Sequence, residues 1–354
     1  MRVYVGFLSV CTLVGLLVCV GLLHAGRFTE MLPDDKTPKK GRKEEEKAET
    51  PTITKPVMFN TVEADDLLSR MRLVPKDSPW LWDVSELPVA RNSKPMIAAV
   101  GANDSVRAVW EMAFVIVPRD QKRVPVRITQ YPRESDKGPY PVPGETPIQG
   151  WPMCGGELSE IQRNGTGDRH AIVLDPCHGR LYEFYDMRLT DAGWTAAQAS
   201  IFDLTSNRLR PRGWTSADAA GLPILPGVVR YDEVERGIVS HAVRVTVNRT
   251  RREYIYPARH FASPHTDPNL PAMGQRLRLR ADFDVTTFPR HTQAVLLGMK
   301  KYGLIVCDNG GNWDICLTPD RRIEDMHSLA RVKGSDLEVV DVSELVRKAA
   351  ARNP

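Results

Sequence analysis

The sequence lacks the short motifs that mark several common catalytic and metal-binding folds. It contains no GxSxG, HExxH, GxxxxGK(S/T), EF-hand or CxxC pattern. The usual sequence support for an α/β-hydrolase, a zincin, a P-loop nucleotide enzyme or a thiol redox enzyme is therefore missing. Chemistry must come instead from dispersed carboxylates, histidines, tyrosines and arginines, as in glycosidases and polysaccharide lyases on β-scaffolds.

A strong charge of one sign is also lacking. The 48 Lys and Arg residues nearly balance 44 Asp and Glu residues, which leaves a formal net charge of +4. So small and dispersed an excess does not indicate a nucleic-acid partner. With 354 residues and 42% hydrophobic content, the chain can bury an ordinary globular core. No pattern in it demands a cofactor.

A long uncharged run is present at the N-terminus. Val3 to Leu23 form 21 consecutive residues without a charged side chain. About 20 apolar residues span a bilayer, whereas the apolar core of a cleaved signal has about 7 to 15. We therefore predict a transmembrane anchor within residues 1–26, with cleavage after LHA as the alternative. The charged, proline-punctuated residues 27–56 predict a flexible linker, and residues 57–354 a single domain.

Cysteines are few, and the body contains Cys154, Cys177, Cys307 and Cys316 in no zinc-binding spacing. The last two flank a Gly-Asn turn in CDNGGNWDIC. A two-residue hairpin at that turn would place them opposite each other, close enough for a disulfide. Cys154 and Cys177 are then candidates for a second bond, and two buried free thiols are the alternative. A disulfide predicts an oxidising compartment, although the basic residues after the apolar run favour a cytoplasmic body.

Short runs rich in Val, Ile, Tyr and Phe dominate the body and are bounded by Pro, Gly, Asn or Asp. Such runs are typical of strands. The ten runs occupy 95–101, 109–118, 124–131, 170–175, 179–187, 240–247, 252–258, 275–283, 303–308 and 336–342. Helical patterns are limited to 62–71, 290–303 and 323–332. The sequence therefore predicts a mainly β domain, an antiparallel β-sandwich or jelly roll with a few short peripheral helices.

Several segments resemble known proteins. They are SIFDLTSNRLRPRGWTSADAAGLPILPGVVRYDEV, SHAVRVTV, YPARHFAS, PAMGQRLRLRADFD and KKYGLIVCDNG. They resemble a group of uncharacterised secreted or membrane-anchored bacterial proteins over roughly Trp80 to Val342. The resemblance implies export and a single large domain, but no activity.

Candidate catalytic residues gather around the strand that begins at His241. His241, Val243, Val245 and Val247 share one face of this strand. A four-residue hairpin loop would place His260 opposite His241, and a three-residue loop would place Arg259 there instead. An acid is then expected nearby, from Asp203, Asp218, Asp232 or Glu233. A satisfied core histidine is the competing interpretation of His241.

Substrate-binding candidates are Arg259 for an anionic group, Trp214 and Tyr254 for stacking on a sugar ring, and the turn residues Asp308 and Asn309. Metal binding by His241 and His260 is an alternative without supporting ligand spacing, so we predict no metal site. Together these residues predict an extracytoplasmic, membrane-tethered protein that acts on polysaccharide by His/Asp general acid–base chemistry, as a glycoside hydrolase or lyase. A non-catalytic module that binds carbohydrate or the cell envelope is the alternative.

Overall fold

The computed structural model describes residues 53–324 and 326–352. The predicted anchor at 1–26 and the predicted linker as far as residue 52 lie outside the described residues. Ile53 is already buried in the core, so the chain joins the body before the predicted boundary at residue 57. In the two described ranges, no helix combines the length and the apolar character that a membrane span requires.

The prediction of a mainly β, antiparallel sandwich or jelly roll is wrong. The structure is 22% helix and 23% strand, and its strands form three sheets. Each sheet contains both parallel and antiparallel pairs. Parallel neighbours need long crossover connections, which a sandwich of hairpins does not contain. The fold is therefore of the mixed α/β type.

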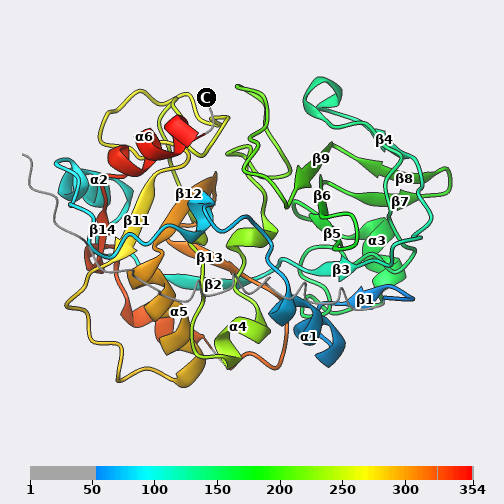
Figure 1. Cartoon of the computed structure of the whole chain (residues 1–354), viewed down its shortest axis with the longest axis horizontal. Helices are drawn as coiled ribbons and strands as arrows, with labels where there is room; N and C mark the ends of the chain where they lie inside the picture. The colour runs from blue at the N-terminus through cyan, green and yellow to red at the C-terminus, as the bar shows by residue number, and fades with distance from the viewer. Residues whose placement is uncertain (1–52, 325, 353–354) are drawn as a thin grey trace, which may run out of the picture. The chain divides into compact units, whose positions relative to one another are not determined.

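The largest sheet has six strands in the order β14-β11-β12-β10-β13-β2 and lies at the left of Figure 1. Its strands are β2 (Arg107–Trp110), β10 (Val243–Val247), β11 (Arg276–Leu279), β12 (Leu304–Asn309), β13 (Asp314–Leu317) and β14 (Leu337–Val339). The parallel pair β10 and β12 is joined through α5 (Arg290–Lys301), whose predicted apolar stripe is buried. Gly298 permits close packing, because a Cβ there would lie 2.5 Å from the Val239 carbonyl oxygen.

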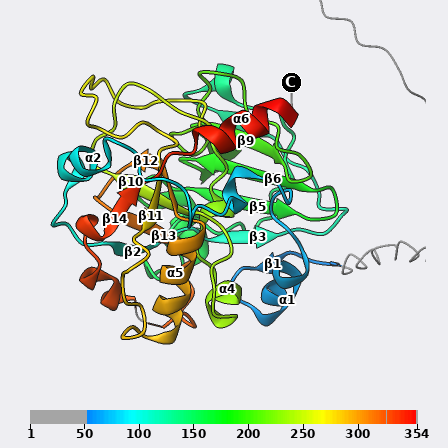
Figure 2. The same cartoon turned by 60° about the vertical axis from the view of Figure 1, so that its left-hand side comes forward.

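The second sheet has five strands in the order β1-β3-β5-β6-β9, and a small sheet has the order β4-β8-β7. Both appear at the right of Figure 1, and the strands of the five-stranded sheet are labelled in the right half of Figure 2. The five strands are β1 (Val57–Met58), β3 (Phe114–Ile116), β5 (Ala171–Asp175), β6 (Arg180–Tyr185) and β9 (Gln198–Asp203). The small sheet contains β4 (Val126–Ile128), β7 (Arg188–Thr190) and β8 (Gly193–Ala196). Residues 171–175, predicted as a strand, are buried throughout.

Short helices cover the sheets and connect them. They are α1 (Val62–Arg70), α2 (Ser93–Val100), α3 (Leu158–Asn164), α4 (Tyr231–Glu235) and α6 (Ser343–Arg352), with 3-10 turns η1 (Pro79–Leu81), η2 (Pro132–Glu134), η3 (Leu225–Gly227), η4 (His327–Arg331) and η5 (Gly334–Asp336). Thr61 caps α1, since its side chain accepts a hydrogen bond from the Ala64 amide. Residues 95–101, predicted as a strand, fall within and just after α2.

An irregular segment, residues 204–230, leads from β9 onto the six-stranded sheet. The Ala220 amide donates to the Cys307 carbonyl oxygen of β12, and Val229 forms a parallel bridge with Leu317 of β13. This segment, which contains GWTSADAAG, therefore brings polar side chains to the place where the two larger sheets approach each other.

The predicted hairpin between Cys307 and Cys316 does not form, because β10 lies between β12 and β13. Two strand spacings of about 4.8 Å separate the two strands, too far for a disulfide. Cys154, Cys177, Cys307 and Cys316 are all free thiols. The disulfide prediction is therefore wrong, and the inference of an oxidising compartment loses this support.

Thiol labelling tests this arrangement. Cys154 is exposed, whereas Cys307 and Cys316 are buried and burial raises the pKa of both thiols. Since the thiolate is the reactive form, iodoacetamide should modify Cys154 in the native protein but Cys307 and Cys316 only after denaturation. Peptide mapping measures the order in which the cysteines are modified. A non-reduced peptide that joins Cys307 to Cys316 would contradict the strand order.

The predicted hairpin that would join His241 to His260 is also wrong. β10 begins only at Val243 and pairs with β12 and β13. Residues 252–258 form no strand and make a single bridge, between Tyr254 and Met273. The alternating side chains of residues 240–247 predicted which of them share a face, but not which strands pair with this one. β10 is buried in the middle of its sheet, so distant strands pair with both of its edges.

Candidate active site

A polar pocket of about 230 Å³ lies where the irregular segment meets the ends of several strands. It is lined by residues from before and within the five-stranded sheet, from the irregular segment, from the loop after β10 and from the end of β12. They are Tyr131, Asp168, His170, Tyr185, Thr215, Ser216, Ala217, Ala219, His260, Ala262, Asp308 and Asn309. Six separate regions of the chain thus contribute to one concave surface.

Asp308 is one of the two carboxylates in the pocket lining, with Asp168. A register shift between β10 and β12 pairs Val245 with Val306 but Thr246 with Asp308. Such a bulge reorients the side chains that follow it. One Asp308 oxygen accepts from the Asn309 amide at 2.7 Å, and the other lies 3.1 Å from the Arg244 guanidinium. The Asp308 side chain is 25% exposed.

The environment of Asp308 raises its pKa. Burial raises the pKa of Asp308 above its usual range, and the nearby Arg244 charge only partly opposes this effect. The carboxylates of Asp168 and Glu111 raise the same pKa further through repulsion. A carboxyl group that keeps its proton closer to neutral pH is the kind of group that can act as a general acid.

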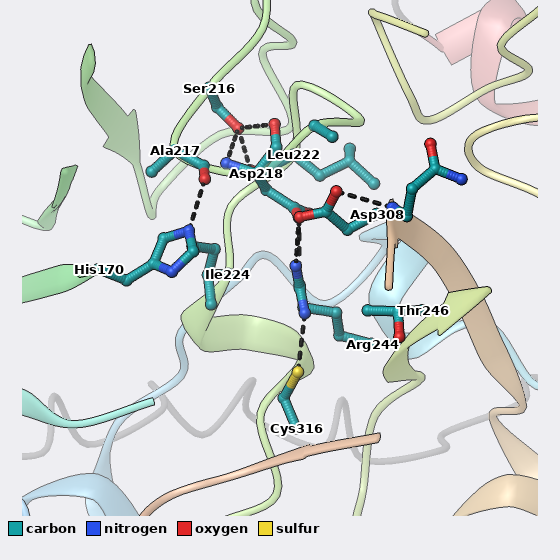
Figure 3. A network of polar contacts seen from close by, with 12 residues as sticks. His170, Ser216, Ala217, Asp218, Leu222, Ile224, Arg244, Thr246, Asp308 and Cys316 are labelled. Carbon is teal, nitrogen blue, oxygen red and sulfur yellow. Dashed lines mark hydrogen bonds and ion pairs between the residues drawn. The ribbon is translucent and has the colours of Figure 1, made fainter. Parts of the chain in front are cut away.

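Arg244 and Asp218 form a buried ion pair beneath Asp308 (Figure 3). One Asp218 oxygen accepts from Arg244 Nη2 at 2.7 Å and from Nε at 3.1 Å. Arg244 Nη1 donates to Cys316 Sγ at 2.7 Å. The guanidinium therefore spans both carboxylates and fixes the position of Asp308.

The loop that contains Asp218 is held by its own side chains. Ser216 Oγ lies 2.9 Å from the Asp218 carbonyl oxygen and 2.7 Å from that of Leu222, and the Asp218 amide donates to it at 3.0 Å (Figure 3). Burial raises the pKa of Asp218 to about 6, and the Arg244 charge opposes that rise. At neutral pH Asp218 is therefore mostly ionised and remains the counter-ion of Arg244.

His260 presents a free ring nitrogen to the pocket. Its Nδ1 lies 2.8 Å from the Ala219 carbonyl oxygen, which can only accept, so Nδ1 carries the proton. No described residue forms a hydrogen bond with Nε2. The ring stacks on Phe261 with an interplanar angle of 4°, which holds its orientation. His260 can therefore accept a hydrogen bond or a proton from a bound ligand.

His170 forms part of the opposite wall. Its ring nitrogens lie 2.9 Å from the Gln149 side-chain oxygen and 2.9 Å from the Ala217 carbonyl oxygen. Burial, together with the Arg244 charge, lowers the pKa of His170 below its usual value. Tyr185 packs against this ring with centroids 5.8 Å apart. His170 is fully engaged and positions the segment at Ala217 rather than a ligand.

The structure brings four of the predicted site residues together. His260, Asp308 and Asn309 line the pocket, and Asp218 lies directly behind it. His241 is elsewhere: it is buried, with Nε2 at 3.1 Å from Glu233 and Nδ1 at 2.8 Å from its neighbour's carbonyl oxygen. Glu233 belongs to the YDEVE segment that was expected to approach it. The predicted meeting of His241 with His260 does not occur.

The remaining predicted residues have structural partners outside the pocket. Asp203 pairs with Arg180 on the neighbouring strand, and buried Asp232 pairs with Arg230. Arg259 donates to the Arg210 carbonyl oxygen, Trp214 lies under the Arg210 guanidinium, and Tyr254 stacks near Phe261. No group of three or more acidic, histidine or cysteine side chains in the described ranges could hold a metal ion.

Sequence reasoning missed Arg244, Asp168 and Tyr185. Arg244 lies in the same run as His241 but on its other face, so the alternation already separated the two residues. Asp168 lies in the loop before β5, and its carboxylate was not singled out. No short motif connects these positions.

Comparison with known protein families, curated proteins and solved structures found no match for this chain. The resemblance to exported bacterial proteins therefore stays a prediction. Function must be argued from the pocket itself.

Proposed function

We propose that this protein cleaves glycosidic bonds in a polysaccharide, with Asp308 as the general acid. The observation that carries the proposal is the raised pKa of Asp308 inside a polar pocket, caused by burial and by nearby carboxylates. A glycosidase needs one carboxyl group that holds its proton near neutral pH and a second group that stays charged.

Asp168 is the proposed second carboxylate. It lies on the pocket wall, is exposed, and acts on Asp308 through its charge. Asp308 would donate its proton to the glycosidic oxygen as the bond to the anomeric carbon breaks. Asp168 would accept a proton from the water that attacks that carbon. Exchange with solvent then restores both groups.

The remaining residues of the pocket lining have side chains that can contact a sugar ring and its hydroxyl groups. Tyr131 and Tyr185 offer apolar faces with polar tips, and Asn309 and the free Nε2 of His260 offer hydrogen bonds to hydroxyl groups. Convergent carboxylates in a concave site support an enzyme rather than a flat binding surface. The predicted anchor at residues 1–26 would hold this body near cell-envelope glycans, which makes them the first substrates to test.

Release of reducing ends from a panel of soluble polysaccharides and envelope glycans tests the proposal. New reducing ends should appear with the wild-type protein. Binding of a glycan without any cleavage would reject the enzyme and favour the carbohydrate-binding alternative.

The pH profile provides a second prediction. Asp308 must be protonated to act, so kcat/KM should fall as pH rises through its pKa. Glu111 lies outside the pocket lining but helps to raise that pKa. Glu111→Gln should therefore lower the pKa and move the alkaline limb to lower pH, with the rate at low pH retained. Exposed Glu253→Gln is the control, and identical limbs in wild type and Glu111→Gln would contradict the assignment.

A further inference from the structure

A second cavity, of about 290 Å³, lies between α1 and α4 and has no part in the proposed cleavage reaction. One wall is apolar and includes Leu68, Leu73 and Leu81. The other wall carries charge, with three arginines, Arg72, Arg230 and Arg236, together with Glu233 and His241. Its lining shares no residue with the pocket around Asp308.

Arg230 is the buried member of the charged wall. Its side chain is only 8% exposed. Nε lies 3.1 Å from Asp232 and Nη2 lies 3.0 Å from Glu233. Its Nη1 is buried and forms no hydrogen bond with any residue that the structure describes. A buried guanidinium nitrogen without an acceptor is costly, so Arg230 keeps a donor on this wall that its two carboxylate partners do not satisfy.

His241 lies beside Glu233 on the charged wall. Its Nδ1 lies 2.8 Å from the Ala242 carbonyl oxygen, and its Nε2 lies 3.1 Å from the Glu233 carboxylate. Burial works against the ionisation of Glu233, but neighbouring Arg230 and His241 outweigh it and lower the pKa of Glu233 to about 2. Glu233 is therefore ionised and already engaged by two partners on this wall.

Positive charge exceeds negative charge around this cavity. The three arginines Arg72, Arg230 and Arg236 are cationic. The carboxylates paired with them are Glu233 and Asp232, the latter 2.9 Å from Arg236 Nη2. Arg236 is half-exposed and Arg72 is exposed, so both can turn toward a ligand.

We propose that this cavity binds a small organic carboxylate, with its anionic group at Arg230 and Arg236 and its aliphatic body against Leu68, Leu73 and Leu81. Arginine suits the anionic group because its N–H donors match both oxygens of a carboxylate. The apolar wall distinguishes such a ligand from an inorganic anion.

Isothermal titration calorimetry with three probes tests this proposal. Hexanoate should bind, whereas hexanol, which lacks the charge, and inorganic phosphate, which lacks the aliphatic body, should bind at least about tenfold more weakly, as expected when one of two contact types is lost. No heat from hexanoate, or equal affinity for all three probes, would overturn it.

Variants locate the site. Arg236→Gln should weaken hexanoate binding about tenfold or more, a loss of one charge-assisted contact. Arg230→Gln should do the same, and Arg236 provides the test if the buried variant does not fold. Arg163→Gln, an exposed arginine paired with Asp191, is the control and should bind normally. Asp308→Asn should also bind normally, so this result is independent of the glycan assay. Unchanged binding in Arg236→Gln would overturn the proposal.

Discussion

Replacement of Asp308 with asparagine is expected to lower glycan cleavage by about 10²–10⁴-fold, the usual contribution of a positioned general acid. Asparagine is similar in size, and its single side-chain oxygen can accept from one of the two donors that contact the separate Asp308 oxygens, the Asn309 amide and Arg244. The pocket should therefore keep its shape, with the loss of one hydrogen bond. Its amide cannot deliver a proton to the leaving oxygen. Initial rates of reducing-end release measure the effect, and the melting temperature should change little.

The matched control is Asp282→Asn. Asp282 is an exposed carboxylate paired with Arg280 outside the pocket, so its loss should leave the rate unchanged. If Asp308→Asn retains activity within a few-fold of wild type while folded, Asp308 is not the acid.

Asp218→Ala is expected to destabilise the protein by about 3–5 kcal/mol, the cost of removing one partner from a buried ion pair. Arg244 is 2% exposed and Asp218 is fully buried, so water cannot replace the lost carboxylate. Asp308 would remain as the single carboxylate near the guanidinium. The denaturant midpoint measures the change in the free energy of unfolding.

Two controls distinguish the loss of a buried charge pair from a general effect of removing one partner of an ion pair. Asp191→Ala removes the partner of exposed Arg163 and should cost less than about 1 kcal/mol. The double variant Asp218→Leu with Arg244→Met removes both buried charges and should recover much of the stability lost in Asp218→Ala. A small loss in Asp218→Ala would show that the pair does not hold the irregular segment in place.

Local structure could be predicted from the sequence more readily than the order of the strands. The apolar stripe of residues 290–303 and the Val/Ile runs at 170–175 and 303–308 form α5, β5 and β12, because periodicity and side-chain type act locally. The Gly-Asn turn suggested a hairpin, but β10 enters between β12 and β13 from more than sixty residues earlier. Pairing between distant strands leaves no local pattern in the sequence.

The site was predictable only in part for the same reason. His260, Asp308 and Asn309 were recognised as candidates from the sequence, but His260 was paired with His241 through a hairpin that does not form. Arg244 faces Asp218 because β10 is central and both of its faces are buried. A half-buried strand would instead have left the Arg244 face in solvent.

The central place of β10 also affects how the protein folds. β13 pairs on its outer side with β2, and Arg107 of β2 bonds to Asp314 of β13 across 207 positions of sequence. Contacts between such distant positions form slowly, because a long loop must close before they contribute. A nascent chain that ends before β12 and β13 has neither Asp308 nor Cys316, so the pocket can be completed only after nearly the whole body has been synthesised. Protein synthesis itself thus delays completion of the pocket until the C-terminal strands have emerged.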